Sequence, residues 1–485
     1  MTNFATLDPA TLTAQRWFFC GIGGSGMLPL ALILRGLGAK VAGSDRSRDQ
    51  GRSPEKFGWL EAQGFALHPQ DGSGITGADQ VLVASAAVED TVPEMVRAKD
   101  LGCARMSRAE LLAALFNAAP VGIAVGGTSG KSTVTGMLGW IMAEAGRDPT
   151  IMNGAVMKNF RTPTALFASA RVGSGAMFVS EVDESDGSIA LYRPTVAVLN
   201  NVSLDHKSLE ELRALFGDFL ARANTAALNL DDAETAALAP HAKAMIRFGI
   251  ARQDADLHVI PGTIIEQPTA LSATLRDARD DSRHALVLAV PGRHNLSNAL
   301  AAIAGAAAAG VPVALSVRHL ATFSGLARRF DIVGTSAGGV TVIDDFGHNP
   351  EKVAATLATM KAHSGRIIAF FQPHGYGPLR QMGAELAEVL GTRLGKDDRV
   401  ILCDPVYFGG TVDRTQGSAR IIELVRLCAE GGAPDMGPIA EYIPSRQDCA
   451  TRIVEIARPG DRVVIMGARD DTLSAFAAGV LARLR

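Results

Sequence analysis

The sequence predicts a chain of α/β domains built on largely parallel β-sheets. Strand-like apolar runs and helix-like runs alternate almost throughout, which is the pattern of parallel strands joined by helices. Two of the strand-to-helix junctions are rich in glycine, at 21–26 and 126–130. With 485 residues, of which 47% are hydrophobic, the chain is too long for one core and is expected to form about three domains.

Composition excludes several classes of protein. The 47 basic residues nearly balance the 50 acidic ones, so the chain lacks the excess of positive charge that is typical of nucleic-acid-binding proteins. The first sixteen residues lack the basic start and apolar core of a secretory signal. The cysteines are odd in number, widely spread and without a Cys-x-x-Cys pair, a pattern typical of reduced thiols: Cys20, Cys103, Cys403, Cys428 and Cys449. We therefore expect a cytoplasmic protein.

One uncharged stretch, 299–317, resembles a membrane span in its hydropathy. It consists mostly of alanine and glycine and is interrupted by Gly310, Val311 and Pro312. This composition favours a tightly packed soluble helix that ends at about Gly310, so no membrane partner is expected.

The first glycine-rich junction follows the apolar run 17–20 and precedes a helix-like segment, 27–37. Gly21, Gly23 and Gly26 form a GxGxxG pattern that also contains Gly24 and Ser25, and a short strand then leads to Asp45. Such a turn suits a pyrophosphate, with the acid near a ribose hydroxyl. By itself the pattern leaves three alternatives open: an NAD(P) site, a site for another diphosphate nucleotide such as a UDP-sugar, or a structural turn.

The second junction contains the most specific motif in the sequence. After the apolar run 121–125 come the residues of a short phosphate loop, which are Gly127, Thr128, Ser129, Gly130, Lys131, Ser132 and Thr133. A strand that turns through glycines into a helix points backbone N–H groups, the helix dipole and one lysine at a single position. We expect Lys131 to contact the β- and γ-phosphates of a nucleoside triphosphate and the Ser132 hydroxyl to ligate Mg²⁺. A glycine turn with a solvated lysine is the alternative.

Two further apolar runs end in candidate metal ligands. The run 177–180 leads into the acidic segment 181–186, which begins with Glu181, and the run 195–200 leads toward His206. Ligands collect at the carboxyl ends of parallel strands, so Lys131, Glu181 and His206 are expected to share one crevice and hold Mg²⁺ on the phosphates. Taken separately, a solvated acidic turn and a helix-capping histidine are the simpler interpretations.

Taken together, eight ordered motifs give the chain a family resemblance over nearly its whole length. They are the segments 21–27, 127–133, 181–186, 205–206, 291–300, 328–330, 344–348 and 371–374. In order and separation they resemble the motifs of the Mur ligases, in particular the alanine-adding branch of that family.

The resemblance implies a three-domain Mur ligase architecture. We expect a Rossmann-like domain that binds a UDP-linked substrate (1–116), a central P-loop-type ATPase domain (117–325) and a Rossmann-like domain that brings the amino acid (326–485). It also implies an ATP-dependent amide ligase that adds an amino acid, L-alanine being the first choice, to a UDP-linked sugar acid, UDP-N-acetylmuramate. The cofactors would be ATP and Mg²⁺, and the protein would be a monomer or homodimer.

The resemblance also implies roles for individual residues. His294 and Asn295 would face the adenine with Asn298 nearby, and Arg329 would reach the γ-phosphate. Ser132 and Glu181 would ligate one Mg²⁺ and His206 a second. The incoming amine would meet Asp344, Asp345 and His348, while His374 and Arg380 would contact the acceptor side. A surface position for His294 and a helix N-cap for Asn295 are the alternatives.

The chemistry explains why these residue types occur together. A carboxylate is a poor electrophile, so phosphoryl transfer from ATP would give an acyl phosphate that an amine attacks. Positioning and charge neutralisation dominate phosphoryl transfer, which suits lysine, arginine and metal ions. Amine attack then needs a base, either His348 or the pair Asp344 and Asp345, with a slight preference for His348.

Departures from the family pattern fall mainly on the acceptor side. Gly375 and Pro378 stand where the family has two of three arginines, and guanidinium groups bind carboxylates bidentately. Ser129, Phe346 and Asn349 replace a histidine, a tyrosine and a histidine. The main alternative is therefore a Mur-like ligase with another carboxylate or UDP-linked acceptor. An NAD(P)-dependent oxidoreductase and a silent nucleotide-binding homologue are more distant ones.

Overall fold

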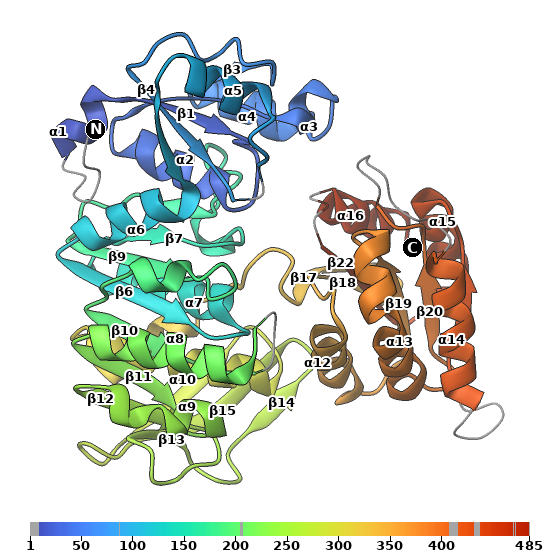
Figure 1. Ribbon diagram of the computed structural model, residues 1–485. Helices are drawn as coiled ribbons and strands as arrows, with labels where there is room; N and C mark the ends of the chain where they lie inside the picture. Colours follow the sequence, from blue (N-terminus) through green and yellow to red (C-terminus); the bar gives the residue numbers. More distant parts are fainter. Residues whose placement is uncertain are drawn as a thin grey trace. The chain divides into compact units, whose positions relative to one another are not determined.

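The computed structural model describes residues 9–86, 88–203, 207–406, 416–430, 437–468, 470 and 472–484. The described strands form three sheets (Figure 1). The chain divides into two compact units, one reaching to Gly325 and the other starting at Leu326, except that the short turn 267–269 groups with the second. The expected α/β class with largely parallel sheets is confirmed.

The first sheet is entirely parallel, with strand order β3-β2-β1-β4-β5. Its strands are β1 (Arg16–Cys20), β2 (Lys40–Ser44), β3 (Ala66–His68), β4 (Gln80–Ala84) and β5 (Ala104–Ser107). The helices are α1 (Pro9–Ala14), α2 (Met27–Gly36), α3 (Arg46–Asp49), α4 (Pro54–Ala62), α5 (Pro93–Asp100) and α6 (Arg108–Ala118). The glycine-rich turn follows β1, the central strand of this order, where nucleotides bind in such sheets.

The central sheet has eleven strands, in the order β14-β15-β13-β12-β11-β10-β6-β9-β7-β8 with β16 beside β15. The parallel part consists of β6 (Val121–Gly126), β7 (Thr150–Met152), β9 (Met177–Glu181), β10 (Val196–Leu199), β11 (Thr225–Asn229), β12 (Met245–Gly249) and β13 (Leu257–Val259). The remaining strands are β8 (Ala170–Arg171), β14 (Ile265–Gln267), β15 (Ala270–Asp277) and β16 (Ser282–Leu288).

Helices of the central region pack on this sheet. They are α7 (Lys131–Glu144), η1 (Lys158–Phe160), η2 (Ser188–Leu191), α8 (Leu209–Arg222), α9 (Ala233–Ala237), η3 (Ala239–His241), α10 (Arg293–Ala308) and α11 (Val313–Leu320). The uncharged stretch forms most of α10, which ends at Ala308, so the prediction of a packed helix ending near Gly310 is confirmed. A Cβ on Gly305 would lie 2.7 Å from Val198, so glycine lets α10 approach the sheet closely. None of the helices in the described ranges is long and apolar enough to cross a bilayer.

The first and central sheets belong to one compact unit and share a hydrophobic core. The ring of Phe116, on α6, lies 5.7 Å from that of Phe178, on β9, and 5.2 Å from that of Tyr192. All three rings are almost fully buried. These aromatic contacts fix α6 against the central sheet.

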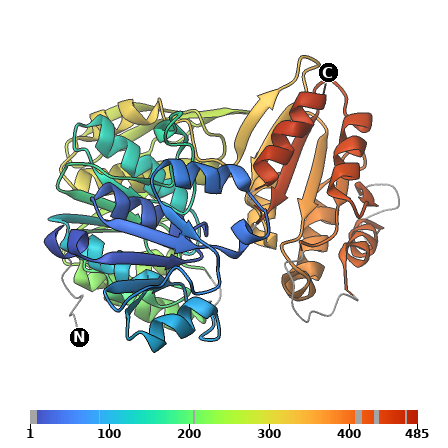
Figure 2. The same cartoon turned by 90° about the horizontal axis from the view of Figure 1, so that it is seen from above.

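The second unit is a six-stranded sheet of order β17-β18-β22-β19-β20-β21, parallel except for β17. The strands are β17 (Asp331–Thr335), β18 (Thr341–Asp345), β19 (Ile367–Gln372), β20 (Arg399–Leu402), β21 (Ile439–Tyr442) and β22 (Arg462–Gly467). Helices α12 (Pro350–Lys361), α13 (Tyr376–Arg393) and α14 (Ser418–Glu430) cover one face, and α15 (Arg446–Ile456) and α16 (Leu473–Arg483) cover the other (Figure 2).

Candidate functional site

The phosphate loop joins β6 to α7, as the sequence predicts. Gly127 and Gly130 adopt φ angles of 133° and 81°, which side chains disfavour, so the turn depends on glycine there. The Lys131 Nζ atom lies 2.7 Å from the Gly127 carbonyl oxygen and 2.7 Å from Oε2 of Glu184. The helix begins at Lys131, so Lys131 and Ser132 occupy its first turn.

Asn201, which follows β10, holds the phosphate loop in place. The Asn201 Oδ1 atom accepts hydrogen bonds from the Ser129 amide at 2.8 Å and from the Thr128 hydroxyl at 3.0 Å. Its Nδ2 donates to the Ser129 carbonyl at 3.0 Å. Asn201 comes two residues after β10, and this position directly after the apolar run 195–200 was the available signal. Sequence reasoning did not identify this residue.

The acidic segment after β9 contacts the loop directly. Because β6 and β9 are neighbours with Val125 opposite Glu181, the Ser132 hydroxyl reaches Oε2 of Glu181 at 2.7 Å. Glu184, which was not singled out beforehand, is 4% exposed and forms the ion pair with Lys131. The structure thus brings Lys131, Ser132 and Glu181 together.

The oxygen donors of Ser132 and Glu181 fit a magnesium ion, which prefers hard oxygen ligands. A Cβ on Gly154 would lie only 2.2 Å from Oε1 of Glu181, so a glycine keeps the space beside this carboxylate free. His206 lies outside the described residues, and among the described ones no group of three or more His, Cys, Asp or Glu side chains is arranged to bind a metal.

The two asparagines predicted to lie near the adenine are inside the protein. Asn295 and Asn298 are 5% and 4% exposed. The Asn298 Oδ1 atom accepts from Asn200 Nδ2 at 2.9 Å, and Asn295 Nδ2 donates to the Pro291 carbonyl at 2.7 Å. The alternative that Asn295 is a helix N-cap is wrong, because Gly292 occupies that position. His294 is exposed, and its contact with adenine remains a prediction.

In the first sheet, Asp45 is bound to the glycine-rich turn. Its Oδ2 accepts a hydrogen bond from the Gly23 amide at 2.8 Å, and its Oδ1 accepts one from the Ser47 amide at 2.8 Å. These bonds give Asp45 a structural role in shaping the turn. Gly24 and Ser25 are exposed at its tip, where a ligand can reach their backbone.

In the C-terminal unit, Asp344 and Asp345 are occupied by neighbouring groups. Asp344 is 1% exposed and accepts hydrogen bonds from Ser474 at 2.7 Å and Arg328 at 3.4 Å. Burial raises its pKa, and the Arg328 charge partly offsets that rise. The two Asp345 oxygens accept from the amides of Phe330 and Gly347, both at 2.8 Å, and from the Thr356 hydroxyl at 3.0 Å.

Arg329 lies in an unusual backbone segment. Its neighbours Arg328 and Phe330 have φ angles of 61° and 47°, which are rare for residues with side chains. The Arg329 guanidinium lies over the Phe346 ring, 4.5 Å from the centroid. Strained backbone of this kind clusters at functional sites.

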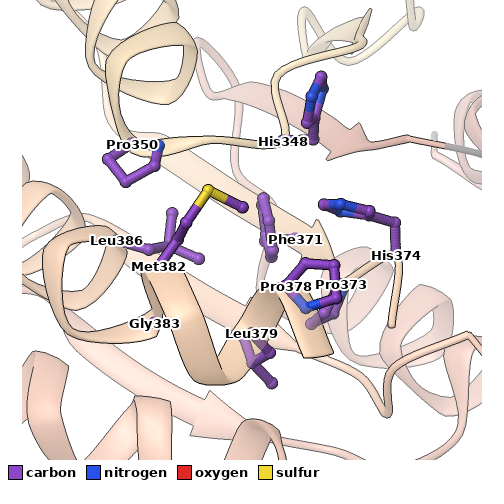
Figure 3. A pocket seen from close by; sticks show the side chains of 10 residues that line it. All are labelled: His348, Pro350, Phe371, Pro373, His374, Pro378, Leu379, Met382, Gly383 and Leu386. Carbon is purple, nitrogen blue, oxygen red and sulfur yellow. The ribbon is translucent and has the colours of Figure 1, made fainter. Parts of the chain in front are cut away.

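His348 and His374 border a pocket of the C-terminal unit, with their ring centroids 5.2 Å apart. Apart from the two imidazoles the lining is apolar: Pro350, Phe371, Pro373, Pro378, Leu379, Met382, Gly383 and Leu386. Figure 3 shows the two rings on one side of the pocket and the Met382 side chain reaching into it.

The protonation state of His348 follows from its surroundings. Its Nδ1 lies 2.9 Å from the Phe346 carbonyl oxygen, and since a carbonyl can only accept, Nδ1–H donates. Burial, together with the positive charge of Lys352, lowers the His348 pKa from 6.5 to about 4. The ring is therefore neutral at pH 7, with Nε2 unprotonated. The Nε2 atom therefore carries a lone pair at this pH.

Gly375 and Pro378 begin helix α13. Gly375 is its N-cap with φ 148°, and Pro378 lies in the first turn and lines the pocket. Arg380, the retained arginine, is exposed on the same helix. Pro378 therefore presents an apolar side chain to the pocket.

Comparison with known proteins agrees with this organisation. The chain matches the Mur ligase family catalytic domain over residues 18–119, the Mur ligase middle domain over 125–306 and the Mur ligase glutamate ligase domain over 328–469. It is 34% identical to "UDP-N-acetylmuramate--L-alanine ligase" of Synechococcus sp. (strain JA-3-3Ab), covering 97% of this chain and 89% of that protein. The protein of the same name from Sorangium cellulosum is 35% identical, with 96% of each chain covered.

Solved structures show the same fold. The UDP-N-acetylmuramate-alanine ligase of Thermotoga maritima superposes with a TM-score of 0.78 at 23% identity, covering 96% of this chain and 98% of that one. A murein peptide ligase from Psychrobacter arcticus gives 0.69 at 24% identity, covering 97% and 98%. The expected three-domain architecture is confirmed, and the chain belongs to the Mur ligase family.

Proposed function

We propose that this chain is an ATP-dependent ligase that joins an amino acid, L-alanine as the first choice, to UDP-N-acetylmuramate in peptidoglycan precursor synthesis. The observation that carries the proposal is the meeting of Lys131, Ser132 and Glu181 at the carboxyl ends of β6 and β9. Relatives of 34% and 35% identity bear the name of that activity over nearly the whole chain. The five free cysteines are consistent with a reducing cytoplasm.

The first half-reaction would activate the acceptor carboxylate as an acyl phosphate. The backbone of residues 127–133 and the Lys131 ammonium would hold the β- and γ-phosphates, which requires Lys131 to exchange Glu184 for the nucleotide. Ser132 and Glu181 would hold Mg²⁺, which when bound neutralises phosphate charge. Arg329 would stabilise the transferring group.

The second half-reaction would form the amide. The neutral His348 ring presents an unprotonated Nε2 that can accept a proton from the attacking amine. Asp345 would support this step indirectly, because its hydrogen bonds to Phe330 and Gly347 shape the loop that carries His348. Asp344 would similarly hold Arg328 beside Arg329.

A specific observation favours a second candidate, a Mur-type ligase with a different acceptor. Gly375 and Pro378 replace guanidinium groups beside His374, and the pocket there is apolar. A substrate that needs fewer charge contacts would suit this wall better than one that needs more.

The test is ADP release measured with UDP-N-acetylmuramate against all common amino acids, with product mass as a second readout. We expect release that requires both substrates and is fastest with L-alanine. Release with other UDP-linked acceptors, but not with UDP-N-acetylmuramate, would select the second candidate. ATP binding without release under any combination would contradict both.

A further inference from the structure

Arg108 lies between the two ligand loops of the first unit. It begins α6, next to the glycine-rich turn of the first sheet. A Cβ on Gly26 would lie 3.0 Å from Cδ of Arg108 and 3.3 Å from its NH1, so the last glycine of the turn makes room for this side chain. A guanidinium group therefore lies against the loop where a diphosphate is proposed to bind.

The same guanidinium group contacts the acidic segment of the central sheet. Its NH2 atom lies 3.3 Å from Oδ2 of Asp186, while Oδ1 of Asp186 accepts a hydrogen bond from the Ser188 amide at 2.8 Å. The same acidic segment binds Lys131 through Glu184 and Ser132 through Glu181. A single short segment thus connects the two loops.

The acidic segment, residues 181–186, forms ion pairs with cations from the regions of both loops. Between 181 and 186 it carries four carboxylates, and Lys131 and Arg108 are the cations paired with it. If Arg108 moves away, the segment becomes more negative and a better site for a cation.

The Arg108–Asp186 pair is suited to exchange partners. The two side chains are 21% and 33% exposed, so solvent weakens their attraction. A guanidinium group that binds phosphate oxygens bidentately is held more strongly than by a single carboxylate contact at 3.3 Å. Since α6 is held against β9 by the Phe116 and Phe178 rings, the exchange needs only side-chain movement.

We propose that Arg108 binds the diphosphate of the UDP-linked acceptor and that its release from Asp186 couples acceptor binding favourably to binding of the metal–nucleotide complex. The inference rests on the proposed function, because it takes the glycine-rich turn as the acceptor's diphosphate site. Coupling of this kind is reciprocal, so each ligand raises the affinity for the other by the same factor.

The test is calorimetric titration of the full chain with UDP, with and without Mg²⁺ and a non-hydrolysable ATP analogue. In the wild type we expect the nucleotide to tighten UDP binding about fivefold, the lower end of the usual range for coupled sites. Arg108→Gln should weaken UDP binding about tenfold, the scale of a lost charge-assisted hydrogen bond, and remove the coupling. Arg108→Lys should recover part of the affinity.

Asp186→Asn separates binding from coupling. It frees Arg108 in advance, so UDP should bind more tightly without nucleotide, and the nucleotide should no longer change that affinity. Arg105→Gln is the matched control, because Arg105 forms an exposed pair with Asp90 at 2.9 Å. Thermal unfolding of each variant checks that the fold is retained.

Three results overturn the inference: unchanged UDP affinity in Arg108→Gln, weaker UDP binding in Asp186→Asn, or coupling that persists in both variants. A wild-type chain that binds neither UDP nor UDP-N-acetylmuramate would instead contradict the proposed function. The two failures are therefore distinguishable.

Discussion

The phosphate loop and the His348 pocket are built in opposite ways. Around the loop, polar side chains from several strands bond to one another, with Asn201 contacting both Thr128 and Ser129. Around His348 and His374 the wall is proline, phenylalanine, leucine and methionine. The first region fits a ligand of fixed charge, a triphosphate. The second is walled by apolar side chains and two imidazoles, and Pro378, one of the departures from the family pattern, lies in its wall.

The largest effect is expected from a substitution in the phosphate loop. Lys131→Ala should lower turnover by about two to three orders of magnitude, the scale seen when a preorganised charge stabiliser is removed. Lys243→Ala, at an exposed position of the central region, is the control and should keep wild-type turnover. Activity of the Lys131 variant near wild type would refute the phosphate role.

His348→Gln tests the pocket side. Because glutamine cannot take up a proton, we expect amide formation to slow by about a hundredfold, the lower end for a general base. Acyl phosphate formation, followed as single-turnover ADP production, should be nearly unchanged.

Asp345→Asn tests whether Asp345 stabilises the loop that carries His348 or acts as the base. An amide cannot accept all the bonds from Phe330, Gly347 and Thr356, so we expect a loss of about 1–3 kcal/mol in the free energy of unfolding. Denaturant unfolding gives this loss. If this variant kept its stability and lost amide formation as severely as His348→Gln, the aspartate would be the base instead.

Asn201→Ala should weaken ATP binding about tenfold, because the Ser129 amide and Thr128 hydroxyl lose an acceptor and the loop is less well ordered. The KM for ATP and direct nucleotide titration measure it. Asn224→Ala, at an exposed position, is the matched control. Equal ATP affinity in both variants would mean that the loop holds its shape without the asparagine.

Restoring charge to the pocket wall should shift selectivity by severalfold. Pro378→Arg adds a guanidinium in the first turn of α13 and should favour UDP-N-acetylmuramate over less charged acceptors. Gly375→Arg is a poorer test, because its φ of 148° strains any side chain. The ratio of kcat/KM values for two acceptors is the readout, with Pro378→Gln as the uncharged control. Identical ratios in the two variants would show that the missing arginine does not set acceptor choice.

The smallest effect concerns pH and stability. The unfolded His348 ring takes up a proton near its ordinary pKa of 6.5, whereas the folded ring stays neutral down to about 4. Protonation therefore favours unfolding, and stability should fall as the pH drops from 6.5 toward 4. His348→Gln should lose only this component, seen as a flatter dependence of Tm on pH over that interval. Parallel curves for the two proteins would contradict the lowered pKa.

Contiguous parts of the site were predictable, and parts assembled from distant residues were not. Gly127 to Ser132 form one strand-to-helix turn, so their geometry is local. Asn201 lies 72 residues from Ser129 in sequence, and only the pairing of β10 beside β6 brings it to the loop. Glu184 was visible within an acidic segment, but its burial against Lys131 was not.

The sequence by itself determined the α/β class, the phosphate loop and the family, because these depend on periodicity and on short motifs whose geometry is local. Tertiary structure decided which polar groups are available to a ligand. Asp45 and Asp345 look like site residues in the sequence, yet backbone amides from neighbouring segments bind their carboxylates. A carboxylate's partners depend on which backbone amides the folded chain brings to it, and periodicity and motif spacing carry no such information.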